Sequence, residues 1–127
     1  MEQSVEPSVR YIVDDVPEAV AFYGLLGFDD AGPDVPGFAL LRGHGITLLL
    51  NAPGAGGAGH PADDGTPPAP GGWNRFQLVV PDVRSEVDRL EREGVPVRMH
   101  AVDGNAGAQA VVEDPSGNPV ELFQPAG

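Results

Sequence analysis

The chain has 127 residues, enough for one compact domain with its own core, so we expect a single domain over residues 1–127. Its formal net charge of −12 disfavours nucleic acid and anionic membranes as partners, and the absence of cysteine excludes disulfides and thiolate metal sites. No apolar run is long enough to span a bilayer, and residues 1–10 lack the pattern of a secretion signal, which predicts a cytoplasmic protein.

The first predicted elements are a strand and an amphipathic helix. The strand, Val9 to Val13, is rich in β-branched residues, and Asp15 after it can cap a helix, with Glu18 completing a capping box. Apolar residues then recur at helical spacing until Gly27 ends the pattern. The expected apolar face of this helix consists of Val16, Val20 and Tyr23. Three strand-like runs follow, the first of them the weakest: Phe28 to Ala31, Gly37 to Arg42 and Ile46 to Asn51.

A segment rich in Gly, Pro and Ala follows, over residues 52–72, with Asp63 and Asp64 as its charged residues. A connector of this length and composition contributes little to a core, so it is either a lid over a functional site or a disordered linker. Trp73, the only tryptophan, stands where this segment meets the next predicted strand. It is either a platform for a ligand or a hydrophobic plug that anchors the segment.

The second half repeats the pattern of the first. Val13, Asp15 and Gly27 recur 67 positions later as Val80, Asp82 and Gly94. The repeat predicts a strand from Phe76 to Val80 and a helix with Val83, Val87 and Leu90 on its apolar face, followed by strands at Pro96 to Val102, Ala108 to Glu113 and Pro119 to Gln124. The sequence therefore predicts an α+β fold of two βαβββ modules, residues 7–51 and 73–127, whose sheets pair into one curved mixed sheet.

The last predicted turn and strand have a distinctive sequence, from Asp114 to Gln124. Asp114 and Asn118 can hold side-chain hydrogen bonds around the intervening Pro and Gly. On the strand, Val120 and Leu122 alternate with Glu121 and Phe123, so the two pairs face opposite sides of the sheet.

This terminal run, together with residues 13–28, resembles the vicinal-oxygen-chelate superfamily, which includes glyoxalases, bleomycin-resistance proteins and dioxygenases. The resemblance covers nearly the whole chain apart from residues 52–72. It implies the predicted fold, but this scaffold carries unrelated activities, so it does not by itself imply one function.

In metal-dependent members of the family, the resemblance implies a His, Glu or Gln on the first and last strand of each half. The corresponding positions here are Ser8, Leu49, Arg75 and Glu121, of which only Glu121 is a credible ligand for a divalent ion. We therefore expect no metal and no cofactor. Arg75 is expected instead to pair with Glu121, unless Glu121 faces solvent and Arg75 lies on the rim. The histidines, which have no metal-ligand spacing and are expected in loops or on the surface, are His44, His60 and His100.

The resemblance therefore implies the metal-free, bleomycin-resistance-like branch, in which a homodimer sequesters an antibiotic in crevices at its interface without altering it. The expected ligand-binding residues are the same four positions and four aromatic wall residues, namely Ser8, Leu49, Arg75 and Glu121 with Tyr11, Phe38, Trp73 and Phe123. The acidic surface suits a cationic ligand such as bleomycin, whereas Arg75 suits a carboxylate, phenolate or quinone oxygen, as in an enediyne or mitomycin-like ligand.

Two other function classes stay open. The first is a metal-dependent enzyme of the glyoxalase, dioxygenase or epimerase type, which requires a divalent ion. The second is a module that binds a partner protein and fills the crevice with its own side chains.

Overall fold

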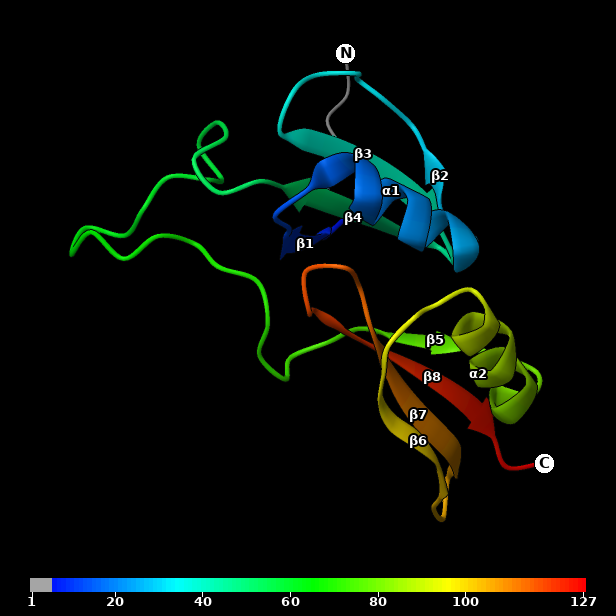
Figure 1. The fold of residues 1–127 in the computed structure, drawn as a ribbon. Helices are drawn as coiled ribbons and strands as arrows, with labels where there is room; N and C mark the ends of the chain where they lie inside the picture. Colours follow the sequence, from blue (N-terminus) through cyan, green and yellow to red (C-terminus); the bar gives the residue numbers. More distant parts are fainter. Residues whose placement is uncertain (1–5) are drawn as a thin grey trace. The chain divides into compact units, whose positions relative to one another are not determined.

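The computed structural model describes residues 6–127 and has an α+β fold with two four-stranded mixed sheets, each accompanied by one helix (Figure 1). The chain divides into two compact units, residues 1–69 and 70–127. Each unit contains one βαβββ module, which confirms the predicted fold class and the internal repeat. The pairing of the two sheets into one curved surface stays a prediction.

In the first unit, β1 pairs in parallel with β4, and the other strand pairs are antiparallel, in the order β1-β4-β3-β2. The predicted early strand after the helix shrinks to the two-residue β2. The elements are β1 (Val9–Ile12), α1 (Val16–Leu25), β2 (Asp29–Asp30), β3 (Phe38–Gly43) and β4 (Ile46–Asn51).

The second unit has the same topology, with the order β5-β8-β7-β6 and a parallel β5–β8 pair. Its elements are β5 (Gln77–Val79), α2 (Val83–Arg92), β6 (Val97–Asp103), β7 (Gly107–Glu113) and β8 (Pro119–Pro125). In each module the first strand pairs in parallel with the last strand. The helix that follows the first strand therefore crosses the sheet and covers one of its faces.

Both helices begin at the predicted aspartates. Asp15 Oδ1 accepts a hydrogen bond from the Glu18 N–H at 3.0 Å, and Asp82 Oδ1 accepts one from the Ser85 N–H at 3.1 Å. The bond from Ser85 also holds the pKa of the Asp82 carboxyl below its usual value, because it favours the ionised form. Neither ten-residue helix could cross a bilayer, and no other helix occurs in residues 6–127.

The core of each unit lies between its helix and one face of its sheet. The predicted apolar face of α2 is correct, since Val83, Val87 and Leu90 are all buried. For α1 the prediction was incomplete, because Val20 is only half-buried whereas Ala19 and Phe22 are buried beside Val16 and Tyr23. The face that α1 buries is thus centred about one residue away from the predicted face.

Candidate functional site

The predicted ion pair between Arg75 and Glu121 is present in the second unit. Arg75 Nη2 lies 2.9 Å and Nε 3.1 Å from Glu121 Oε1. Glu121 is 9% exposed, so the alternative in which it faces solvent is wrong. Two of the three Arg75 guanidinium nitrogens thus contact Oε1. Gln77, directly opposite Glu121 in the β5–β8 register, donates to Oε2 at 2.6 Å. Both oxygens of the carboxylate are therefore engaged by side chains of the same unit.

The other two positions of the predicted quartet lie in the first unit and carry poor donors for a metal. Ser8 directly precedes β1, and Leu49 is a half-buried residue of β4. Within residues 6–127, no three His, Asp or Glu side chains gather as a metal site requires. The donors that the two units supply at these positions are a hydroxyl and one carboxylate that is already paired.

Trp73 is 65% exposed, which overturns the alternative that it acts as a hydrophobic plug. One face of its ring lies over the guanidinium of Arg98, with Cζ 4.6 Å from the ring centroid. Arg98 is itself fixed by Glu113 Oε2 at 2.7 Å, by Gly72 O at 2.6 Å and by Gly117 O at 2.9 Å. The indole is thus held on a fixed cation while most of its surface faces solvent, and its role as a ligand platform stays a prediction.

Phe123 lies on β8 two residues after Glu121, so strand alternation puts the two side chains on the same face of the sheet. Val120 and Leu122 alternate with them on the opposite face, as predicted, and are buried in the core. Phe123 is half-buried and pairs in register with exposed Val79. Phe123 therefore lies on the sheet face that carries the ion pair, and its predicted contact with a ligand stays a prediction.

The prediction for Tyr11 was wrong. Its ring packs edge-on against Tyr23 of α1, with the centroids 6.3 Å apart, so it faces the core rather than a ligand. Alternation along β1 puts Arg10, which pairs in register with Leu49, on the opposite face. The same alternation was available from the sequence, because Ser8 and Tyr11 are three positions apart and cannot share a strand face.

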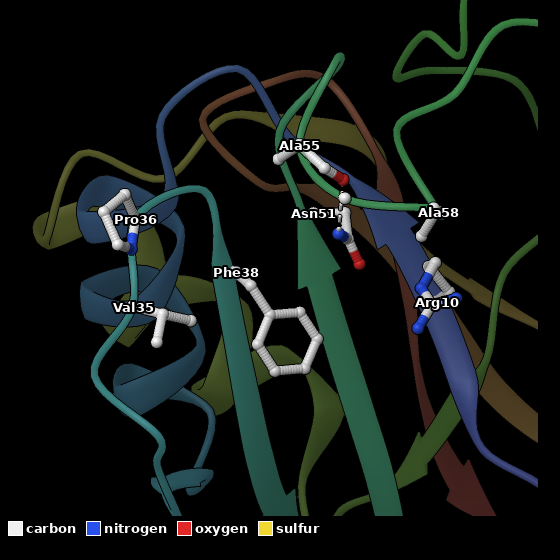
Figure 2. A pocket seen from close by; sticks show the side chains of 9 residues that line it. Arg10, Val35, Pro36, Phe38, Asn51, Ala55 and Ala58 are labelled. Carbon is white, nitrogen blue, oxygen red and sulfur yellow. Dashed lines mark hydrogen bonds between the residues drawn. The ribbon is translucent and has the colours of Figure 1, made fainter.

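Phe38 lines a cavity of about 340 Å³ in the first unit, together with Arg10, Val35, Pro36, Asn51 and residues 55–58 (Figure 2). A cavity of this size is at the lower end of the range for ligand pockets. It lies on the sheet face opposite α1, since Phe38 and Asn51 alternate along their strands with Ala39 and Leu50, which are buried in the core. Phe38 thus lines a cavity of the first unit, and its predicted role as a wall residue against a ligand stays a prediction.

The beginning of the predicted lid or linker forms one wall of this cavity. Residues 52–59 close into a turn in which Gly54 N donates to Gly59 O at 2.9 Å and Gly59 N donates to Ala55 O at 3.0 Å. A Cβ on Gly59 would lie 2.3 Å from Ala55 N, so the turn requires glycine there. Whether this wall moves to admit a ligand stays a prediction.

Asn51, the last residue of β4, was not among the site residues predicted from the sequence. Asn51 is 4% exposed, and its Nδ2 donates to Ala55 O at 3.4 Å. Its Oδ1 is shielded and accepts no hydrogen bond from any residue between 6 and 127. An unsatisfied buried polar group costs roughly 1–3 kcal/mol. The one signal in the sequence was a polar amide at the end of an otherwise apolar strand.

The histidines lie where the sequence predicts. His44 occupies the turn between β3 and β4, and its Nε2 donates to Leu26 O at 2.6 Å. His60 is exposed in the connector. His100 is exposed on β6, and its Nε2 lies 3.2 Å from Glu91 Oε2. Each histidine thus contacts a different residue, respectively Leu26, Pro61 and Glu91, and the three do not gather at one site.

Comparisons with known proteins agree with the fold. A family model described as the Glyoxalase/Bleomycin resistance protein/Dioxygenase superfamily matches residues 7–122. No curated protein matches the chain. Similar solved structures include a hypothetical protein, SA1046, from S. aureus, at 14% identity over 97% of this chain and 95% of that one, with a TM-score of 0.77.

Two further solved structures are similar over nearly the whole chain. Lactoylglutathione lyase from Agrobacterium tumefaciens is 22% identical over 98% of this chain and 96% of that one, with a TM-score of 0.71. TioX from Micromonospora sp. ML1 is 19% identical over 97% of this chain and its whole length (100%), with a TM-score of 0.74. At these identities the likeness supports the fold and not an activity.

Proposed function

This chain belongs to the glyoxalase/bleomycin resistance protein/dioxygenase superfamily, and we propose that it binds and sequesters a small, partly planar antibiotic without altering it. The observation that carries the proposal is that side chains of the protein, Arg75 and Gln77, engage both oxygens of Glu121. Bleomycin-like, enediyne-like and mitomycin-like compounds are the ligands that we would test first. The bound form that we propose is a homodimer with the ligand in a crevice at its interface.

The family implies a divalent metal ion in its enzymes, and the residues present here do not fit one. To ligate an ion, Glu121 would have to share oxygens that Arg75 and Gln77 already engage, and the guanidinium would repel the ion at close range. Ser8 and Leu49 offer at most one weak oxygen donor. The metal-dependent alternative, a glyoxalase, dioxygenase or epimerase, therefore lacks a ligand set in the positions that its relatives use.

Exposed aromatic and apolar surface supports binding of a flat ligand. Trp73 presents most of its ring to solvent while Arg98 holds it in place, and Phe38 lines a cavity in the other unit. Rings that are already fixed lose little conformational entropy on binding, so their contact area contributes efficiently to affinity.

A fluorescence titration tests the proposal, because all tryptophan emission comes from Trp73. We expect a member of at least one of the three antibiotic classes to quench Trp73 emission, and the quenching to saturate at one ligand per chain. Native mass spectrometry should then detect the complex with the intact mass of the ligand. In the Trp73→Ala variant we expect binding of that ligand to weaken by about 10-fold.

The Arg92→Gln variant serves as a control, since Arg92 is an exposed residue at the end of α2. It should bind as the wild type does. Absence of any saturable complex with all three classes, or a ligand that is released with a changed mass, would contradict sequestration.

A further inference from the structure

Asn51, which lines the cavity of the first unit, has a shielded hydrogen-bond acceptor without a donor among residues 6–127. The atom of the Asn51 amide that faces Ala55 O must be Nδ2, since a carbonyl oxygen can only accept. Oδ1 therefore points away from Ala55, and Figure 2 shows it on the side of Phe38 and Arg10. No described residue donates to it. A ligand that enters this cavity can supply the missing O–H or N–H.

Arg10 places a free positive charge beside this acceptor. Arg10 pairs in register with Leu49 and Asn51 pairs with Ile12, so Arg10 and Asn51 are diagonal neighbours on one sheet face. The Arg10 side chain is exposed and forms no ion pair with any carboxylate among residues 6–127. This differs from the second unit, where Gln77 occupies the equivalent place on β5 and Arg75 is paired with Glu121.

The rest of the cavity is apolar and suits a ring. Phe38 lies directly opposite Asn51 in the β3–β4 register, and Val35, 44% exposed, and Pro36 stand beside it. Because Oδ1 is shielded, a donor reaches it only after a neighbouring side chain shifts. Arg10 lines the same cavity with a long, exposed side chain that forms no ion pair with the described residues, so it can change its position.

We infer that this cavity binds an aromatic hydroxy acid: the ring lies against Phe38, a hydroxyl donates to Asn51 Oδ1, and the anionic oxygen pairs with Arg10. The inference rests on the proposed function and narrows its ligand class, from any flat antibiotic to one that carries an acidic group near a donor. It also moves the recognition of a ligand anion from Arg75, whose charge is already compensated, to Arg10.

The probe is 4-hydroxy-2-naphthoate, in which the hydroxyl is meta to the carboxylate and cannot bond to it internally. Its two matched controls are 2-naphthoate, which lacks the hydroxyl, and methyl 4-hydroxy-2-naphthoate, which lacks the charge. Binding is measured by amide chemical-shift changes in NMR titrations of the full chain. For a fragment of this size we expect a dissociation constant on the order of 1 mM, weakening about 3-fold to 10-fold in each control.

Two variants assign these preferences to their residues. In Arg10→Gln the preference for the acid over the ester should disappear, while the preference for the hydroxyl persists. In Asn51→Leu the preference for the hydroxyl should disappear, and the midpoint of urea unfolding should not fall, because Ala55 O still accepts from Gly59 N. Arg92→Gln should preserve both preferences. If Asn51→Leu does not fold, Arg10→Gln alone decides the assignment of the charge.

The inference is overturned if the wild type binds all three naphthalenes equally, or if the preferences survive in both variants. It is also overturned if an antibiotic that lacks an acidic group saturates Trp73 quenching while 4-hydroxy-2-naphthoate causes no shifts around residues 51–58. In that last case sequestration would stand and only the ligand class would be wrong.

Discussion

Replacing Arg75 with methionine is expected to lower the free energy of unfolding by about 2–4 kcal/mol, because it leaves the Glu121 carboxylate largely buried without its cation. The Glu121 side chain is 12% exposed and that of Arg75 27%, so solvent screens the pair only in part. Gln77 still donates to Oε2, which keeps the loss below that of a carboxylate with no partner at all. Urea unfolding followed by circular dichroism measures the difference.

The double variant Arg75→Met with Glu121→Leu is the matched control. Removing both charges together leaves no unpaired carboxylate, so most of the lost stability should return, to within about 1 kcal/mol of the wild type. This outcome would mean that the two residues act as one unit. If the single variant is as stable as the wild type, the pair is as weak as a surface ion pair and Glu121 is not committed to Arg75.

The Asp114→Ala variant is expected to lose about 3 kcal/mol of stability, since it strands several buried donors at once. Asp114 is 1% exposed, and its Oδ1 accepts from the N–H groups of Ser116 and Asn118, each at 2.9 Å. Its Oδ2 accepts from Asn118 Nδ2, also at 2.9 Å. This carboxylate therefore holds the turn that leads into β8, the strand that carries Glu121.

Asp114→Asn should cost less than the alanine variant, because it keeps one carbonyl oxygen that can still accept from the turn. Thermal unfolding of the two variants in parallel with the wild type gives the order. Equal stability of Asp114→Ala and the wild type would contradict the account of this turn. A loss of stability in Asp114→Asn as large as in Asp114→Ala would mean that the negative charge, rather than the number of acceptors, determines the effect.

Local chemistry explains why the fold could be predicted from the sequence. Asp15 and Asp82 cap their helices through side-chain bonds to residues three positions on, and such bonds depend only on nearby sequence. The repeat of these landmarks then implied two modules of one kind. The ion pair of Arg75 with Glu121 was predicted from the family resemblance, which implied the four positions, and the repeat placed Arg75 at the position equivalent to Ser8.

The rest of the candidate site depended on contacts between segments distant in sequence. Trp73 is held by Arg98, which reaches it through bonds to Gly72, Glu113 and Gly117, and no local pattern indicates that arrangement. Residues 52–59 fold back over the end of β4, where Asn51 is buried and its Oδ1 has no donor among residues 6–127. Composition identified that segment as rich in glycine but could not indicate the wall that it forms.

The net charge of −12 suggested a cationic ligand, whereas the cavity beside Arg10 favours an anion. The surface charge and the cavity act over different distances. The field of the whole surface is screened by salt beyond about 10 Å and mainly affects the rate at which a ligand is encountered. The contacts within the cavity determine which ligand stays bound. An acidic protein can therefore bind an acid at a site that contains one unpaired guanidinium.

Binding by chelator-treated protein tests the central claim most directly. Protein is dialysed against EDTA, its metal content is measured by elemental analysis, and the antibiotic that saturates Trp73 quenching is titrated again by calorimetry and then recovered for mass spectrometry. We predict an unchanged dissociation constant, one ligand per chain and a recovered ligand of unchanged mass. Loss of binding that Zn, Ni, Mn or Fe restores, or a ligand that returns chemically altered, would contradict the account.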